Sequence, residues 1–233
     1  MRIVSAVVVL AAANLLNNWL ARGPAVYVVV CVTATVALLL IARWDGLTLA
    51  DLGLDGAAVR RGLRWVPVLV GVVLLVLGLL LVAPAGREAF RDARAVDLSV
   101  GRLLWVTLVR VPFGTVLLEE TAFRGVLWAM IRRRHGTAWA TGVSSLLFGL
   151  WHLMPARGIN RSNAAVGSAF GDSAAGVAPT VAVAIVATAV AGVVLCELRR
   201  RSDSLLPPMA LHWAVNSLGY AFAWAAARWW LDG

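Results

Sequence analysis

Charged residues are scarce in this chain. Only 14% of its 233 residues are charged, whereas 61% are hydrophobic. Soluble domains typically carry about 25% charged and 45–50% apolar residues. This shortage of charge excludes an ordinary soluble domain and indicates an integral membrane protein.

Lysine is absent, so all 21 basic residues are arginines. We interpret this bias as the codon habit of a GC-rich bacterial genome. In a soluble protein the formal charge of +9 would favour nucleic acid as a partner, but these arginines lie mostly in short connections between apolar runs, as the positive-inside rule requires. The sequence therefore predicts membrane lipids, and no nucleic acid, as partners.

Cysteine is rare as well. Cys31 and Cys196 each lie inside an apolar run, a pattern that indicates neither a disulfide framework nor a zinc-binding cluster. We expect both to be packing residues.

Long apolar runs dominate what remains. Runs able to cross about 30 Å of hydrocarbon cover residues 3–21, 25–42, 65–82, 103–131, 177–198 and 208–230, and a shorter run at 137–154 can form a seventh span. The predicted fold is all-α: a polytopic transmembrane bundle of about seven helices in a single membrane domain, residues 1–233.

The distribution of arginines between the spans predicts the orientation. One alternate set of connections is richer in positive charge, with arginines at 2, 43–64, 132–134 and 199–201. We therefore expect a multi-pass protein of the bacterial plasma membrane with a cytoplasmic amino terminus.

Two connections stand out by composition. Residues 47–65 alternate leucines with charged residues, which predicts one interfacial helix between the second and third spans. Residues 155–176 are rich in Gly, Ser and Asn without periodicity, which predicts a flexible loop.

Three charged residues interrupt the run at 103–131. Four residues turn a helix by about 400°, so Glu120 and Arg124 lie on nearly one face and can neutralise each other. Glu119 is turned about 100° away from Glu120, so it must face another partner. An unpaired charge in a spanning helix costs about 2.5–3.5 kcal/mol, which makes this leftover carboxylate a candidate functional group.

Two further polar pairs occur in apolar runs. His152 follows Phe148 by four residues, and His212 precedes Asn216 by four. Taken singly, a histidine of this kind is more often a core residue with one hydrogen bond, and a polar pair one turn apart is more often interhelical glue. Taken together with Glu119, the side chains of these pairs supply a general base, imidazoles and an amide, which are the parts of a hydrolytic or proton-handling site.

The three stretches EETAFR (119–124), FGLWH (148–152) and HWAVN (212–216) resemble the CPBP family of intramembrane proteases, also called the CAAX prenyl protease or Abi family. That family carries EExxxR, FxxxH and HxxxN or HxxxD in this order. The resemblance covers residues 110–220. It implies that Glu119 and His152 activate water, that His212 and Asn216 hold the oxyanion, and that Glu120 with Arg124 supports the first motif, with Phe148 as the aromatic of the second. The catalytic core would then be about 101–230, after accessory spans in 1–100.

The resemblance leaves a metal open, because the family has been described both as metalloproteases and as glutamate proteases. Zinc commonly takes three protein ligands and keeps one open position, and Glu119, His152 and His212 could supply them. No HExxH pair on one helix supports this, so we favour no metal cofactor and keep zinc as the alternative.

The predicted function is intramembrane endopeptidase action on a membrane-associated protein or peptide. One alternative is a non-catalytic membrane scaffold or bacteriocin-immunity-type protein of the same family. Another is a transporter with a Glu119–His152 proton relay, which the lack of paired inverted halves disfavours.

Overall fold

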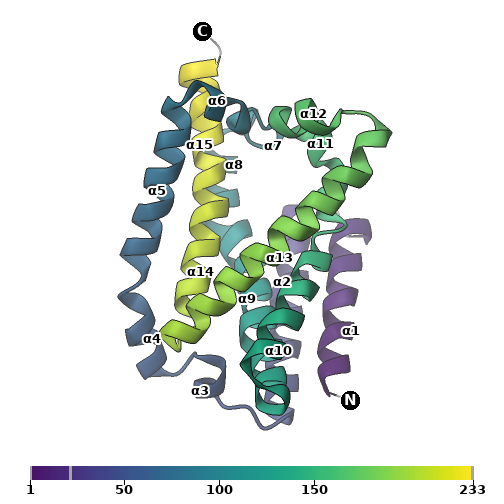
Figure 1. Cartoon of the computed structure of the whole chain (residues 1–233), viewed down its shortest axis with the longest axis vertical. Helices are drawn as coiled ribbons and strands as arrows, with labels where there is room; N and C mark the ends of the chain where they lie inside the picture. The colour runs from purple at the N-terminus through teal and green to yellow at the C-terminus, as the bar shows by residue number, and fades with distance from the viewer. Residues whose placement is uncertain (1, 21–22, 232–233) are drawn as a thin grey trace.

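The computed structural model of the chain describes residues 2–20 and 23–231 (Figure 1). Ala21, the last residue of the first predicted span, lies outside the described residues. Within them the secondary structure is helical, and the only β pairing is an isolated bridge between Asp92 and Asn163. The predicted all-α fold is confirmed.

The helices run mainly along the long axis of the molecule, and α13 crosses the bundle obliquely (Figure 1). The first half of the chain forms α1 (Arg2–Leu15), η1 (Leu16–Leu20), α2 (Pro24–Trp44) and α5 (Val66–Val82). A continuous helical stretch then comprises α8 (Val100–Trp105), η3 (Val106–Val116), α9 (Leu117–Glu120), η4 (Thr121–Leu127) and α10 (Trp128–Trp151). The chain ends with α13 (Val177–Ser202), α14 (Leu206–Trp213), η7 (Ala214–Leu218), α15 (Gly219–Ala226) and η8 (Ala227–Leu231).

The count of seven spans is not confirmed, although every predicted span coincides with a helical stretch. Length and apolarity identify four spanning helices among the described residues, or five if the pair Leu49–Leu63 and Val66–Val82, bent by 61°, forms one span. Two predicted spans, 103–131 and 137–154, fall in the single stretch Val100–Trp151. That stretch breaks at Gly136, where φ is +82° and ψ is 175°, so the helix axis changes direction there. The last predicted span, 208–230, lies in the helical stretch Leu206–Leu231, which is not among the four helices.

The core lies where α1, α2, α9, η4 and α10 meet. Small side chains fill the contacts of α1 and α2, including Ala6, Ala13, Ala34 and Ala42. A Cβ added at Gly149 of α10 would lie 2.6 Å from the Ile185 carbonyl oxygen of α13. Helices in lipid associate through such close approaches of small residues, because lipid offers no hydrophobic drive between helices.

Residues 47–65, predicted as one interfacial helix, are helical but divide into two short helices. These are α3 (Leu49–Leu52), which begins at a Thr48–Asp51 capping box, and α4 (Gly56–Leu63). The break falls at Gly53, whose φ of +71° is left-handed, a conformation that terminates helices and favours glycine.

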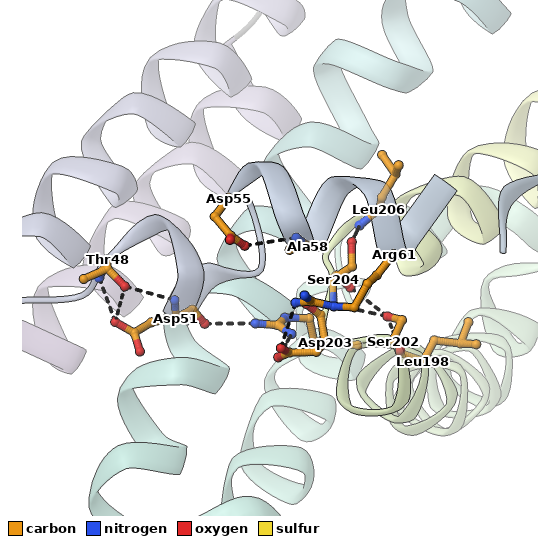
Figure 2. Close-up of polar contacts among 11 residues, drawn as sticks. Thr48, Asp51, Asp55, Ala58, Arg61, Leu198, Ser202, Asp203, Ser204 and Leu206 are labelled. Atoms are coloured by element: carbon orange, nitrogen blue, oxygen red, sulfur yellow. Dashed lines mark hydrogen bonds and ion pairs between the residues drawn. The ribbon is translucent and has the colours of Figure 1, made fainter. Parts of the chain in front are cut away.

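Polar contacts attach α3 and α4 to the turn between α13 and α14 (Figure 2). Arg61 pairs with Asp203 at 2.9 Å, and Arg199 donates to the Asp51 carbonyl at 2.9 Å. The Leu205 amide donates to the Gly53 carbonyl at 3.0 Å. These contacts hold the two short helices against the start of α14.

Gly53→Ala is expected to destabilise the protein by about 2–4 kcal/mol. Alanine at a left-handed φ is strained, and its Cβ would lie 2.6 Å from Cζ of the buried Arg199. Thermal unfolding in detergent measures the effect. Gly142→Ala is the matched control, because Gly142 lies inside α10 with open space at its Cβ position and should gain up to about 1 kcal/mol of helix propensity. Equal unfolding midpoints for the two variants would contradict the prediction.

The predicted flexible loop at 155–176 was wrong. The segment forms η5 (Pro155–Gly158), α11 (Ile159–Ser162), α12 (Ala164–Phe170) and η6 (Ala174–Gly176). Buried Asn160 donates to the carbonyls of Gly171 and Ser173, and Asn163 caps α12. The polar residues that suggested a loop are thus the ones that hold these short helices. The preceding connection forms α6 (Pro84–Arg87), η2 (Glu88–Phe90) and α7 (Ala93–Val96). Helix α12 contacts η2, and the Ala164 amide donates to the Arg91 carbonyl at 3.0 Å.

Asp45 joins three parts of the bundle at the end of α2. Its buried carboxylate pairs with Arg2 at 3.5 Å, with Arg134 at 2.7 Å and with Arg133. Burial alone would raise the pKa of Asp45, but the hydrogen bond from Arg134 and the charges of Arg134 and Arg133 outweigh it and lower that pKa. The ionised carboxylate therefore stabilises the fold.

Asp45→Asn is expected to cost about 1–2 kcal/mol at neutral pH, since the half-exposed arginines are screened by solvent. A carboxylate with a lowered folded pKa stabilises above its unfolded pKa of about 3.9, and that contribution is lost as pH falls through the folded pKa. The difference in unfolding midpoint between parent and variant should therefore shrink below about pH 4. A difference that does not change with pH would contradict this, and exposed Asp97→Asn serves as the neutral control.

Candidate active site

A cavity of about 700 Å³ lies between the first two helices and the later part of the bundle. Glu119, His152 and Asn216 are on its wall. These side chains come from α9, from the residue that follows α10, and from η7. The structure therefore brings one residue from each of the three sequence motifs to a common space.

Glu120 and Arg124 form the buried ion pair that the helical spacing predicts. Arg124 Nη1 lies 3.1 Å from Glu120 Oε1, and both side chains are fully buried. His212 joins the pair, because its Nδ1 lies 2.7 Å from the same Glu120 oxygen. A carboxylate accepts from both groups, which links the helix of the first motif to that of the third.

Glu119 faces away from this pair, as expected. It is only 3% exposed, and its Oε1 accepts a hydrogen bond of 2.9 Å from the Trp151 indole. Its Oε2 has no hydrogen-bond donor among the described residues. The His212 Nε2 atom lies 3.9 Å from this oxygen. Glu119 thus combines one anchored oxygen with one oxygen that accepts no hydrogen bond from the described residues.

Phe148 packs between the three motifs. The Arg124 guanidinium carbon lies 3.9 Å from the centre of its ring, within the range of a cation–π contact. The rings of His152 and His212 meet it edge to face at 4.7 and 6.1 Å. The aromatic of the second motif therefore supports the guanidinium and both imidazoles.

The two histidines have different surroundings. His152 lines the cavity, and its Nδ1 lies 2.8 Å from the Phe148 carbonyl. Because a carbonyl only accepts, Nδ1 carries the proton and Nε2 holds the lone pair in the neutral ring. His212 is 9% exposed and lies behind the cavity wall, against Glu120.

Asn216 reaches the wall although His212 does not. The two residues share one face of a regular α-helix, but η7 is a wider π turn that changes their relative direction. Sequence spacing alone places them together, and the structure places only Asn216 on the cavity wall.

Wide turns also surround the glutamates, since η3 and η4 are π-helical. Pro112 lies inside η3. Proline has no amide hydrogen and its ring clashes with a carbonyl one turn earlier, and a π turn is one way in which a helix accommodates such a break. Turns of this kind often occur at functional sites.

Sequence reasoning missed Trp151 and Asn14. Trp151 anchors Glu119, and the Asn14 side chain of α1 donates to the Trp151 carbonyl at 3.0 Å. The sequence does contain a signal for both residues: an indole next to His152 and an asparagine in an apolar run. Buried polar groups need partners, so each could have been expected to bond to another polar group. Asn14 and Tyr27 also line the cavity, so the expected accessory spans contribute to its wall.

Three of the predicted site residues are possible metal ligands by residue type. In the part of the chain that the structure describes, no three His, Cys, Asp or Glu side chains are arranged to hold a metal ion. Glu119, His152 and His212 are therefore not placed as the three-ligand set that zinc commonly takes.

A family model of the Rce1-like type II CAAX prenyl endopeptidases matches residues 101–218. This match covers half of the chain and includes all three motifs. The chain belongs to the Rce1-like family. No curated protein and no solved structure matches the chain.

Membership of the Rce1-like family agrees with the apolar helices. The protein is a multi-pass membrane protein of a protease family, and a family of this kind acts on membrane-associated proteins in a lipid environment. The resemblance identified from the three motifs is confirmed.

Proposed function

We propose that the protein is an intramembrane endopeptidase in which Glu119 and His152 activate water. The observation that carries this proposal is the environment of Glu119: a buried carboxylate on the wall of a cavity, with Oε1 held by Trp151 and Oε2 without a protein donor. Such an oxygen is able to accept a proton from water, and the anchored one fixes its direction.

The reaction begins when Glu119 takes a proton from a water molecule while the lone pair on His152 Nε2 orients it. The water oxygen bonds to the peptide carbonyl carbon, and the carbonyl oxygen becomes an oxyanion. Asn216 donates to this oxyanion from the cavity wall, and His212 in its protonated form stabilises it through its positive charge from behind that wall. Glu119 then passes its proton to the amide nitrogen, and the C–N bond breaks as the oxyanion re-forms the carbonyl. The new carboxylic acid gives its remaining proton to the released amine, so a carboxylate and an ammonium group leave and Glu119 is again ionised.

Three supporting residues keep this arrangement in place. Glu120 holds His212 through Nδ1, Arg124 neutralises Glu120, and Phe148 packs against Arg124 and both imidazoles. These residues act on catalysis only through the groups that they position.

The substrate class is a membrane-associated protein or peptide of a bacterial plasma membrane. The amino terminus is cytoplasmic in this proposal, because the arginine-rich connections follow the positive-inside rule. The catalytic residues lie in the proposed core at about 101–230.

Sequencing of protein termini tests the function. Membranes from cells that make the parent protein are compared with membranes from cells that make His152→Ala at the same level. We expect new termini beside spanning segments only with the parent. Identical termini in the two samples would instead support the non-catalytic scaffold or immunity-type function.

Metal dependence is tested on the purified parent in proteoliposomes, with a peptide that spans one of those cleavage points. The proposal predicts unchanged hydrolysis after EDTA treatment and no stoichiometric zinc by elemental analysis. Loss of hydrolysis that added zinc restores would overturn the metal-free chemistry while leaving the endopeptidase assignment in place.

A further inference from the structure

Arg110 is a cationic side chain on the cavity wall that the proposed chemistry does not use. It lies in η3, inside the continuous helical stretch that carries Glu119. An ionised arginine within a spanning stretch is costly unless it is paired. The groups around Arg110 therefore indicate whether its charge is paired within the protein or is available to a ligand.

The described residues offer Arg110 no carboxylate within 4 Å and no hydrogen-bond acceptor. The two acids on the same wall are engaged elsewhere: Glu119 accepts from Trp151 at 2.9 Å, and Asp92 pairs with Arg94 at 2.5 Å. Five N–H donors of a guanidinium thus remain for a ligand.

The guanidinium is nevertheless held in position. Its carbon lies 4.6 Å from the centre of the Tyr27 ring, a cation–π contact. The Tyr27 hydroxyl is 3.2 Å from Thr115 Oγ1, which fixes the ring. Stacking of this type leaves the edge of the guanidinium plane, where the donors are, available for a bidentate partner.

We propose that Arg110 and Tyr27 form an anion subsite that binds a carboxylate of the substrate. This inference rests on the proposed function because it calls the ligand a substrate, but the binding itself does not depend on catalysis. The carboxylate comes from an acidic side chain or from the end of the substrate chain. Arg110 precedes Glu119 by nine residues, at most about 13 Å along the helix, and an extended peptide covers this distance in about four residues. The carboxylate therefore lies within about four residues of the bond that is cleaved.

Binding of three fluorescent peptides to the Glu119→Gln protein in detergent tests the subsite by fluorescence anisotropy. The peptides share one apolar sequence: one has a carboxamide end, one has the same end and a central glutamate, and one has a free terminal carboxylate. We expect at least one acidic peptide to bind about ten- to a hundredfold more tightly than the neutral peptide, as for a charge-assisted hydrogen bond. The peptide that gains affinity identifies the source of the carboxylate.

Adding Arg110→Gln should remove this preference without changing the affinity for the neutral peptide, and Arg110→Lys should retain part of it. Exposed Arg102→Gln in α8 is the matched control and should retain all of it. Equal affinity for the three peptides, or an acid preference that survives Arg110→Gln, overturns the proposal. If Arg110→Gln does not fold, equal binding of the three peptides to the Glu119→Gln protein, in which Arg110 is intact, still overturns the proposal.

The two proposals fail separately. If the preference for acidic peptides depends on Arg110 but the parent protein cleaves no substrate, the anion subsite is supported and the endopeptidase function is refuted. Cleavage by the parent together with equal binding of the three peptides supports the endopeptidase function and overturns the anion subsite.

Discussion

Glu119→Gln is expected to lower the rate of peptide hydrolysis by about 10³-fold or more, because a positioned general base contributes about 10²–10⁴-fold. Glutamine has nearly the same shape, and its side-chain oxygen still accepts from the Trp151 indole as Glu119 Oε1 does. It has no carboxylate to take a proton from water. The measurement is kcat in proteoliposomes with a peptide that spans a mapped cleavage point.

The control for this substitution is Glu197→Gln in α13. Glu197 is an acid near the surface that pairs with Arg200 at 2.7 Å, and it lies outside the cavity. Its replacement should leave kcat unchanged. A Glu119→Gln protein with the turnover of the parent would refute the proposed role of Glu119 as the base.

Arg124→Met is expected to destabilise the protein by about 3–5 kcal/mol, because removal of one partner of a buried ion pair leaves the other charge unpaired. Glu120 is fully buried, and its second oxygen has no donor among the described residues. His212 alone would then face the carboxylate. Unfolding in detergent by heat or denaturant measures the loss.

The double variant Glu120→Gln with Arg124→Met should recover at least about 1 kcal/mol of that loss, since it removes both buried charges. A glutamine oxygen still accepts from His212 Nδ1. Arg201→Met is the matched control, because the side chain of Arg201 is 64% exposed where it pairs with Glu197, and a surface pair contributes about 0–1 kcal/mol. An Arg124→Met protein as stable as the Arg201→Met protein would exclude the supporting role of the buried pair.

Spacing predicted the buried pair for a simple reason. Glu120 and Arg124 lie four residues apart, which is close to one turn both in an α-helix and in the wider π-helix η4, so either helix keeps them adjacent. The same argument left Glu119 without Arg124, and the structure gives it Trp151 instead. A local contact follows from the sequence because its geometry depends on one helix only.

Other features depended on segments far apart in the chain. Residues 155–176 form short helices because Asn160 and Asn163 bond to backbone groups of their own segment and of residues near 89–91. The helix break at Gly53 is stabilised by the turn at Leu205. Composition describes the residues of such segments but not their partners, so it predicted a loop and a single helix.

The sequence by itself determined the helical membrane fold, the family and the set of polar residues that the apolar helices must bury, because each follows from local hydrophobicity and from spacing along one helix. Only the tertiary structure decided that Trp151 holds Glu119, that His212 stands behind the wall against Glu120, and that Arg110 shares the cavity with Glu119. The physical reason is that these contacts join different helices or pass through π turns, and the direction of a side chain across such a turn depends on how the helices pack.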